Sequence, residues 1–205
     1  MKPSSLKIGI DVPWVTSWTG EPALGVRPCL SVNGAVAVVQ ADNPGQGRPL
    51  YSQNHAVRQR LSVRDMLCPM CGRPTPAGDR WTQVAHPVSV GRLRADGRGH
   101  RLPADLADDQ MLIDAGAIAP LHRACVDRSL RYCPHLKADP NIDVRRFPDR
   151  WIVLPLLARA EAPARLFLAR PAPARVVPVI GFLQLCGLSG ELDQTWRAEV
   201  PPRGR

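Results

Sequence analysis

Residues 66–72 read MLCPMCG, and residues 121–136 read LHRACVDRSLRYCPHL. Each stretch holds two metal-ligand side chains separated by two residues, Cys68 and Cys71 in the first, His122 and Cys125 in the second. Three thiols and one imidazole form a ligand set that tetrahedral Zn²⁺ takes in structural sites. The sequence therefore predicts a Cys3His metal site, and Zn²⁺ is the cofactor that we expect.

The residues around these ligands predict a knuckle and a helix. Pro69 restricts the backbone between the first two cysteines, and Gly72 permits the positive φ that a tight turn after them often needs. Pro120 favours the start of a helix over 121–132, which places the second ligand pair in its first turn. Residues 79–94 alternate as strands do. A knuckle, a strand pair and a helix that supplies the last two ligands together describe a treble-clef-like finger.

Other cysteine and histidine residues lie near these stretches. His86 and His100 are alternatives to His122 as the fourth ligand. If the helix is continuous, Cys133 lies eight residues beyond Cys125, about 12 Å along the axis, which is too far for one ion. We therefore expect Cys133 to be buried against the core and Pro134 to end the helix.

The composition indicates which kinds of partner and which cellular compartment to expect. The 205 residues include 27 Lys or Arg and 18 Asp or Glu, which gives a net charge of +9. This charge favours acidic partners such as nucleic acid, although the arginines are spread along the chain. The first residues lack the apolar core of an export signal, and the most apolar run, residues 176–188, is too short and too interrupted to span a bilayer. We expect a cytoplasmic protein with reduced cysteines and no membrane partner.

We expect an α+β fold in which a treble-clef-like zinc-binding core carries short strands and two or three short helices. The 22 prolines imply many loops. Residues 1–45 form an N-terminal extended arm and a hairpin turning at Asn33-Gly34, residues 46–140 the zinc-binding core, and residues 141–205 a proline-rich β or extended C-terminal part. Trp14 and Trp18 anchor the arm on the core, or alternatively stack on bases.

Two further helices are predicted inside the core segment. Residues 51–67 contain neither Gly nor Pro and place Arg58, Arg60 and Arg64 on or near one side. This basic side would contact the phosphates of a nucleic acid, or alternatively would face solvent. A second helical pattern begins at Gln110 and continues towards Pro120.

The chain resembles a group of uncharacterised proteins from actinobacteria and their phages. The resemblance covers roughly residues 13–155. It is carried by PWVTSWTGE at 13–21, LCPMCGRP at 67–74, Trp81, PLHRACVDRSLRYCPHL at 120–136 and DRW at 149–151. It implies a zinc-finger-like core and brings no activity with it.

Three functions compete at this stage. The first is a non-enzymatic zinc-binding module that docks a nucleic acid or a protein, because four protein ligands leave no open position for substrate. The second is an HNH-like nuclease, suggested by VAHP at 84–87 but opposed by Ala85, which stands where an acidic residue is expected. The third is a phage structural or assembly protein. A thiol redox role for Cys68 and Cys71 is disfavoured, because the prolines after them prevent a helix from starting there.

Overall fold

The computed structural model describes residues 2–83, 86–99, 102–116, 120–138, 142, 144–147, 151–157 and 178–186. Within them the chain is α+β with short strands and few helices, as expected. The strands are β1 (Thr16–Trp18), β2 (Ala23–Pro28), β3 (Val36–Gln40), β4 (Pro49–Asn54), β5 (Trp81–Thr82), β6 (His86–Ser89), β7 (Met111–Gly116), β8 (Arg145–Arg146), β9 (Trp151–Leu157) and β10 (Val179–Cys186). The α-helices are α1 (Ala56–Asp65), α2 (Val90–Ala95), α3 (Arg123–Tyr132) and α4 (Pro134–Ala138). No helix in these ranges is long and apolar enough to cross a membrane.

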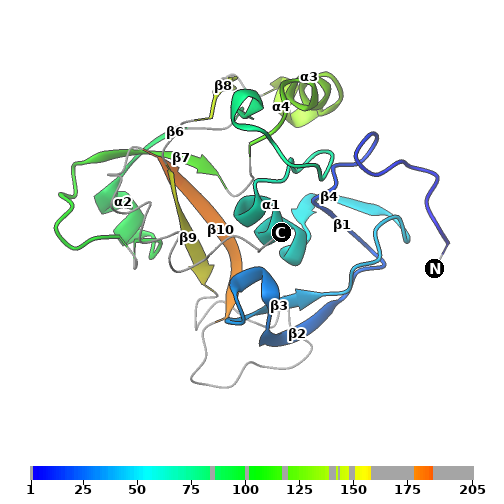
Figure 1. The fold of residues 1–205 in the computed structure, drawn as a ribbon, viewed down its shortest axis with the longest axis horizontal. Helices are drawn as coiled ribbons and strands as arrows, with labels where there is room; N and C mark the ends of the chain where they lie inside the picture. Colours follow the sequence, from blue (N-terminus) through cyan, green and yellow to red (C-terminus); the bar gives the residue numbers. More distant parts are fainter. Residues whose placement is uncertain are drawn as a thin grey trace.

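The largest sheet takes strands from all three segments distinguished in the sequence (Figure 1). Its order is β2-β3-β10-β7-β6, and β9 pairs with β10 as well. The hairpin of β2 and β3 turns through Asn33 and Gly34, both at positive φ, and β6 with β7 forms the other side of the sheet. Smaller sheets pair β1 with β4 and β5 with β8. Strand β10 therefore joins the N-terminal hairpin to the segment that carries the predicted zinc ligands.

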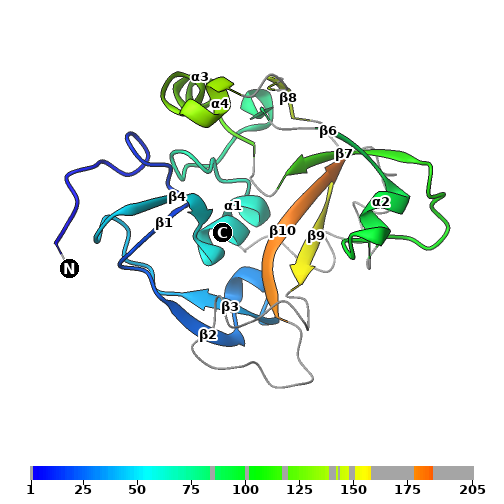
Figure 2. The ribbon, with the colours of Figure 1, turned by 180° about the vertical axis from the view of Figure 1, so that it is seen from behind.

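Within the described residues, strand β10 has one edge that no single neighbouring strand covers. One edge pairs with β9 from end to end, so β3 and β7 share the other, at Val179 and at residues 184–186. Between them, Gln59 of α1 donates its Nε2–H to the Phe182 carbonyl and accepts the Phe182 N–H, each at 3.0 Å. A Cβ at Gly181 would lie 3.0 Å from this amide. A side chain thus replaces a missing strand, and Figure 2 shows α1 lying against β10.

Pro155 does not interrupt strand β9, although a proline removes one ladder donor. Its partner in the register is Phe182, which turns both backbone groups towards Gln59 and away from β9. Pro155 therefore occupies a pair without ladder hydrogen bonds, where the missing N–H costs nothing.

The arginines of α1 lie in the interior, in contrast to both expectations for this helix. Arg58 is 3% exposed and Arg60 is fully buried. Arg60 donates to Ser31 Oγ at 2.8 Å and to the Val38 carbonyl at 2.6 Å. Arg64 pairs with Asp65 and donates to the Leu30 carbonyl. The prediction that Arg58, Arg60 and Arg64 contact nucleic acid is therefore wrong for the first two, and the third is already bound within the chain.

The segment from Met111 to Gly116 is a strand and not the predicted helix. Leu112 and Asp114 are buried, and β7 pairs on one side with β6 and on the other with β10. Pairing on both sides stabilises this conformation over the local helical pattern. Residues 117–119 lie outside the described residues, as do 158–177 and 187–205, which contain most of the predicted proline-rich extended part.

Candidate metal centre

The first ligand pair lies in a tight knuckle between α1 and β5. The Gly72 N–H donates to the Cys68 carbonyl at 2.7 Å, and the Cys68 N–H donates to the Arg73 carbonyl at 2.8 Å. Gly72 has φ +74°, and a Cβ there would lie 2.9 Å from the Trp14 ring. Both constraints require glycine at this position.

The N-terminal arm holds the outside of this knuckle. The Trp14 N–H donates to the Met70 carbonyl at 2.8 Å, and the Val15 N–H donates to the Pro69 carbonyl at 3.0 Å. Trp18 is 1% exposed. The two tryptophans therefore anchor the arm, which confirms the first of the two interpretations given for them.

The second ligand pair lies at the start of α3, as the sequence predicts. His122 is the N-cap residue, and Cys125 follows in the first turn. Leu121 exchanges two backbone hydrogen bonds of 2.9 Å with Trp81, which ties this helix start to β5. A buried cluster of Cys68, Met70, Leu121, Cys125 and Val126 fills the space between knuckle and helix.

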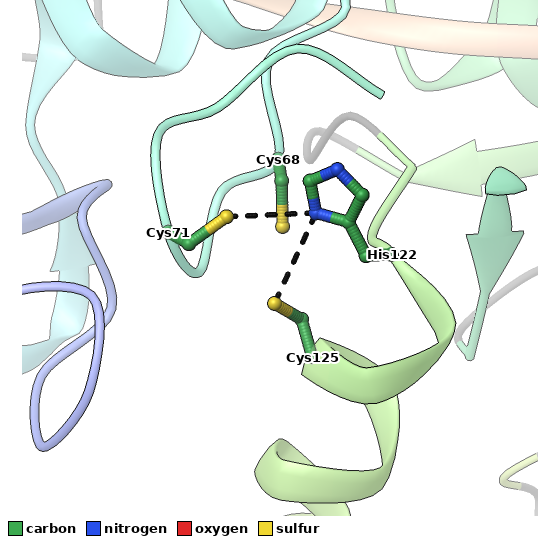
Figure 3. Close-up of side chains that lie close together, drawn as sticks. All are labelled: Cys68, Cys71, His122 and Cys125. Carbon is green, nitrogen blue, oxygen red and sulfur yellow. Dashed lines mark hydrogen bonds between the residues drawn. The ribbon is translucent and has the colours of Figure 1, made fainter. Parts of the chain in front are cut away.

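The four predicted ligands converge on one point (Figure 3). Their ligand atoms all lie within 4.8 Å of one another, so the group could hold a metal ion. His122 Nδ1 lies 3.5 Å from Cys71 Sγ and 4.0 Å from Cys125 Sγ. The opposite ring nitrogen, Nε2, donates to the Pro74 carbonyl at 3.0 Å. This hydrogen bond selects the tautomer whose Nδ1 lone pair faces the sulfur atoms.

The pKa values of the three thiols are shifted in opposite directions, upwards by burial and downwards by Arg73. Burial raises the pKa of Cys68. Burial and the neighbouring Cys68 and Cys71 raise the pKa of Cys125 to about 12. Burial opposes ionisation of Cys71 too, but hydrogen bonds from the backbone and side chain of Arg73 lower its pKa to about 7. Three thiolates this close together need a bound cation to exist at neutral pH, and a metal ion supplies that charge.

A second group of possible ligands was not anticipated from the sequence. Glu21, Asp42 and His55 also place their ligand atoms within 4.8 Å of one another. Arg58 already provides the positive charge there, with Nη1 2.6 Å from both carboxylates. His55 Nδ1 accepts the Arg58 N–H at 3.2 Å, and its Nε2 donates to the Ala41 carbonyl at 2.9 Å. Both ring nitrogens are used, so this group is an ion-pair cluster. Glu21, Asp42 and His55 are too far apart in the sequence for a motif to predict this cluster.

Cys133 is not among the four converging ligands, as predicted, but it is half-buried and not buried against the core, and Pro134 begins a new helix where the prediction had it only end one. Helix α3 ends at Tyr132, Cys133 donates its N–H to the Ser129 carbonyl at 2.8 Å, and Pro134 begins α4. Proline suits a first helical position because its missing N–H would have no partner there.

The alternative fourth ligands are not tested by the structure. His86 lies in β6, where its backbone pairs with Asp114 and its side chain is outside the description. His100, Val84 and Ala85 also lie outside the described residues, so the HNH-like alternative stays a prediction.

Comparisons with models of protein families, with curated proteins and with solved structures found no match to this chain. The metal centre must therefore be interpreted from its own geometry.

Proposed function

We propose that this chain is a non-enzymatic zinc-binding module, in which Cys68, Cys71, His122 and Cys125 hold one structural Zn²⁺. One observation carries the proposal, the convergence of four protein ligand atoms within 4.8 Å. Tetrahedral zinc with bonds of about 2.3 Å to sulfur and about 2.0 Å to nitrogen needs sulfur and nitrogen atoms about 3.5 Å apart and sulfur atoms about 3.8 Å apart. The Cys71 Sγ–His122 Nδ1 distance of 3.5 Å matches that requirement, and the Cys125 Sγ–His122 Nδ1 distance of 4.0 Å exceeds it by about 0.5 Å, which a small side-chain rotation would close.

The type of ligand favours zinc over other common metals. Magnesium and calcium prefer oxygen ligands, whereas three thiolates and an imidazole suit a tetrahedral soft or borderline ion. The hydrogen bond from His122 to the Pro74 carbonyl is the outer support that zinc-bound imidazoles usually have. All four positions of a tetrahedral ion would be filled by the protein, which leaves none for water or substrate.

The bound ion would connect two parts of the chain that are far apart in sequence. The knuckle at Cys68 and the start of α3 at His122 meet through a small cluster that includes two of the ligands. The order of a knuckle, strands and helix α3 supports a treble-clef-like core, but its strands differ from the pair expected within 79–94: β6 pairs with β7, β5 pairs with β8, and Val90–Ala95 is helix α2. Zinc in such a core is a scaffold that positions a surface for docking a nucleic acid or a protein partner.

The test is the zinc content of the purified chain, measured by elemental analysis, together with thermal unfolding before and after chelation. We expect one zinc per chain and a lower Tm after its removal, because binding free energy at structural sites is folding free energy. Zinc-free protein that folds with an unchanged Tm after zinc addition would overturn the proposal. Apo protein reloaded with Mg²⁺ is the matched control, and it should remain at the lower Tm.

A further inference from the structure

The positive charge of the chain is concentrated around the metal centre. Residues 72–82, 121–138 and 145–147 contain eight Arg or Lys residues against two Asp, a net charge of +6 in 32 residues. The whole chain carries +9. These three segments meet at Trp81, which pairs with Leu121 on one side and with Arg146 on the other. Figure 1 shows β8 and α3 along the same edge of the molecule.

We infer that this basic face, defined by Arg123 and Arg146 on the Trp81 ring and extended along α3 by the exposed Arg131, binds the phosphate backbone of a nucleic acid. The inference rests on the proposed function, because the metal would join the segment that follows the knuckle to α3 and so assemble the face. The proposed contacts to nucleic acid are therefore these exposed arginines and not the buried arginines of α1.

Two of these arginines are held in place by an aromatic ring. The guanidinium carbon of Arg123 lies 4.9 Å from the Trp81 ring centroid, and that of Arg146 lies 5.3 Å from it. Asp79 fixes the ring by accepting the Trp81 Nε1–H at 3.0 Å, and it accepts the Arg123 backbone N–H at 2.8 Å. Arginines stacked in this way lose less conformational entropy when they bind.

Both stacked guanidiniums can offer donors to an anion. Arg123 uses Nε to contact Asp127 at 3.1 Å, and Arg146 uses Nη1 to contact the Gly78 carbonyl at 3.2 Å. Each guanidinium has five N–H donors, so these contacts leave donors that can reach phosphate oxygens. Arg131 is exposed two turns beyond Arg123 on α3, about 12 Å along the axis. That length matches three or four nucleotides of one strand, at about 3.4 Å each.

The composition of the face favours nucleic acid over a protein partner. Seven of the eight cationic residues are arginines, whose planar group matches phosphate geometry. Protein interfaces have an apolar core depleted in charge. Among the described residues of these segments, Tyr132 is the only exposed large hydrophobic. Trp81 is only half-exposed and holds arginines, so we expect binding with little base specificity.

The test is binding of the zinc-loaded full chain to a fluorescent 20-base-pair duplex, and to a single strand of the same length, over a salt series. The double variant Arg123→Gln/Arg146→Gln should weaken duplex binding about tenfold or more and reduce the slope of log K against log salt by about 2. Arg27→Gln/Arg48→Gln removes the same charge from exposed residues outside the face, and it should change affinity much less. A larger loss for the single strand than for the duplex would identify the single strand as the preferred ligand.

Two outcomes would overturn the inference. If both double variants weaken binding equally, the interaction comes from diffuse charge and not from this face. If the zinc-loaded chain binds neither nucleic acid at low salt, but binds poly-glutamate through Arg123 and Arg146, the partner is an acidic protein. Zinc content measured on every sample separates these results from failure of the proposed function, which would appear as protein without metal.

Discussion

The candidate metal centre and the ion-pair cluster each gather potential metal ligands around one histidine, but the first pairs it with three thiols and the second with two carboxylates and an arginine. Each brings a histidine and at least two other potential ligands within 4.8 Å. In the metal centre, His122 gives one nitrogen to the Pro74 carbonyl and turns the other towards two thiols. In the ion-pair cluster, His55 uses both nitrogens for backbone groups, and Arg58 lies between the carboxylates.

The difference shows that proximity alone does not define a metal site. A metal site needs a ligand atom whose lone pair accepts no hydrogen bond. It also needs negatively charged ligands that no protein cation already neutralises. The thiols around His122 come much closer to both conditions, because Nδ1 carries no proton and the guanidinium that lowers the pKa of Cys71, that of Arg73, is exposed to solvent. The carboxylates around His55 meet neither. The following experiments test this distinction, in order of decreasing expected effect.

Replacing a zinc ligand should give the largest effect. Cys68→Ser or Cys125→Ser should abolish zinc binding and unfold the segment between the knuckle and α3, since structural zinc contributes about 10–16 kcal/mol in finger peptides. Elemental analysis and thermal unfolding followed by circular dichroism measure both effects. A variant that kept its zinc and its Tm would show that these cysteines are not ligands.

Breaking the ion-pair cluster should destabilise the chain and leave the zinc in place. Arg58→Met removes the partner of the buried Glu21 carboxylate, which should cost about 3–5 kcal/mol. Urea unfolding measures the change, with the exposed Arg27→Met as a control expected to remain within about 0.5 kcal/mol. Loss of zinc from folded Arg58→Met protein would mean that the two clusters are not independent.

The knuckle turn can be tested with a pair of glycine substitutions. Gly72→Ala combines a positive φ with a collision against Trp14, and should cost about 1–3 kcal/mol and weaken zinc binding in chelator competition. Gly34→Ala has a similar φ of +83° but no atom within 4 Å, so it isolates the backbone strain. Equal effects of the two variants would show that the contact with Trp14 contributes nothing.

Cys133→Ser should give the smallest effect. The thiol is half-buried and outside the metal centre, so the variant should keep one zinc and lose about 1 kcal/mol or less. Zinc content and urea unfolding test this expectation. Loss of the metal would make Cys133 a ligand and would contradict the grouping seen around His122.

The sequence predicts the metal centre well because its information is local. Each ligand pair has a fixed spacing, and the turn at Gly72 and the helix after His122 orient the pairs with short-range contacts. The α1 arginines show the opposite case. The partner of Arg58 is Glu21, 37 residues away, and Arg60 reaches Ile180, 120 residues away. A helical pattern does not reveal such distant partners, so a buried arginine and an exposed one look the same in the sequence.

Strand β7 could not be predicted for a related reason. Its six residues have a local helical pattern, but their conformation is decided by strands that come from other parts of the chain. The role of Pro134 is ambiguous in the sequence for a local reason, because a proline can follow the end of one helix and also start the next one. Only the local geometry after Tyr132 distinguishes these possibilities.

The central place of β10 also sets an order for folding during synthesis. The hairpins of β2 with β3 and of β6 with β7 have no common strand until β10 is made. All four candidate metal ligands have been synthesised by Cys125, roughly 60 residues before β10 is complete. At ribosomal rates this interval lasts on the order of several seconds. A metal ion could therefore bind to the nascent chain while the two halves of the main sheet are still separate. At that time the Gln59 side chain would not yet have its hydrogen-bond partner, the Phe182 backbone.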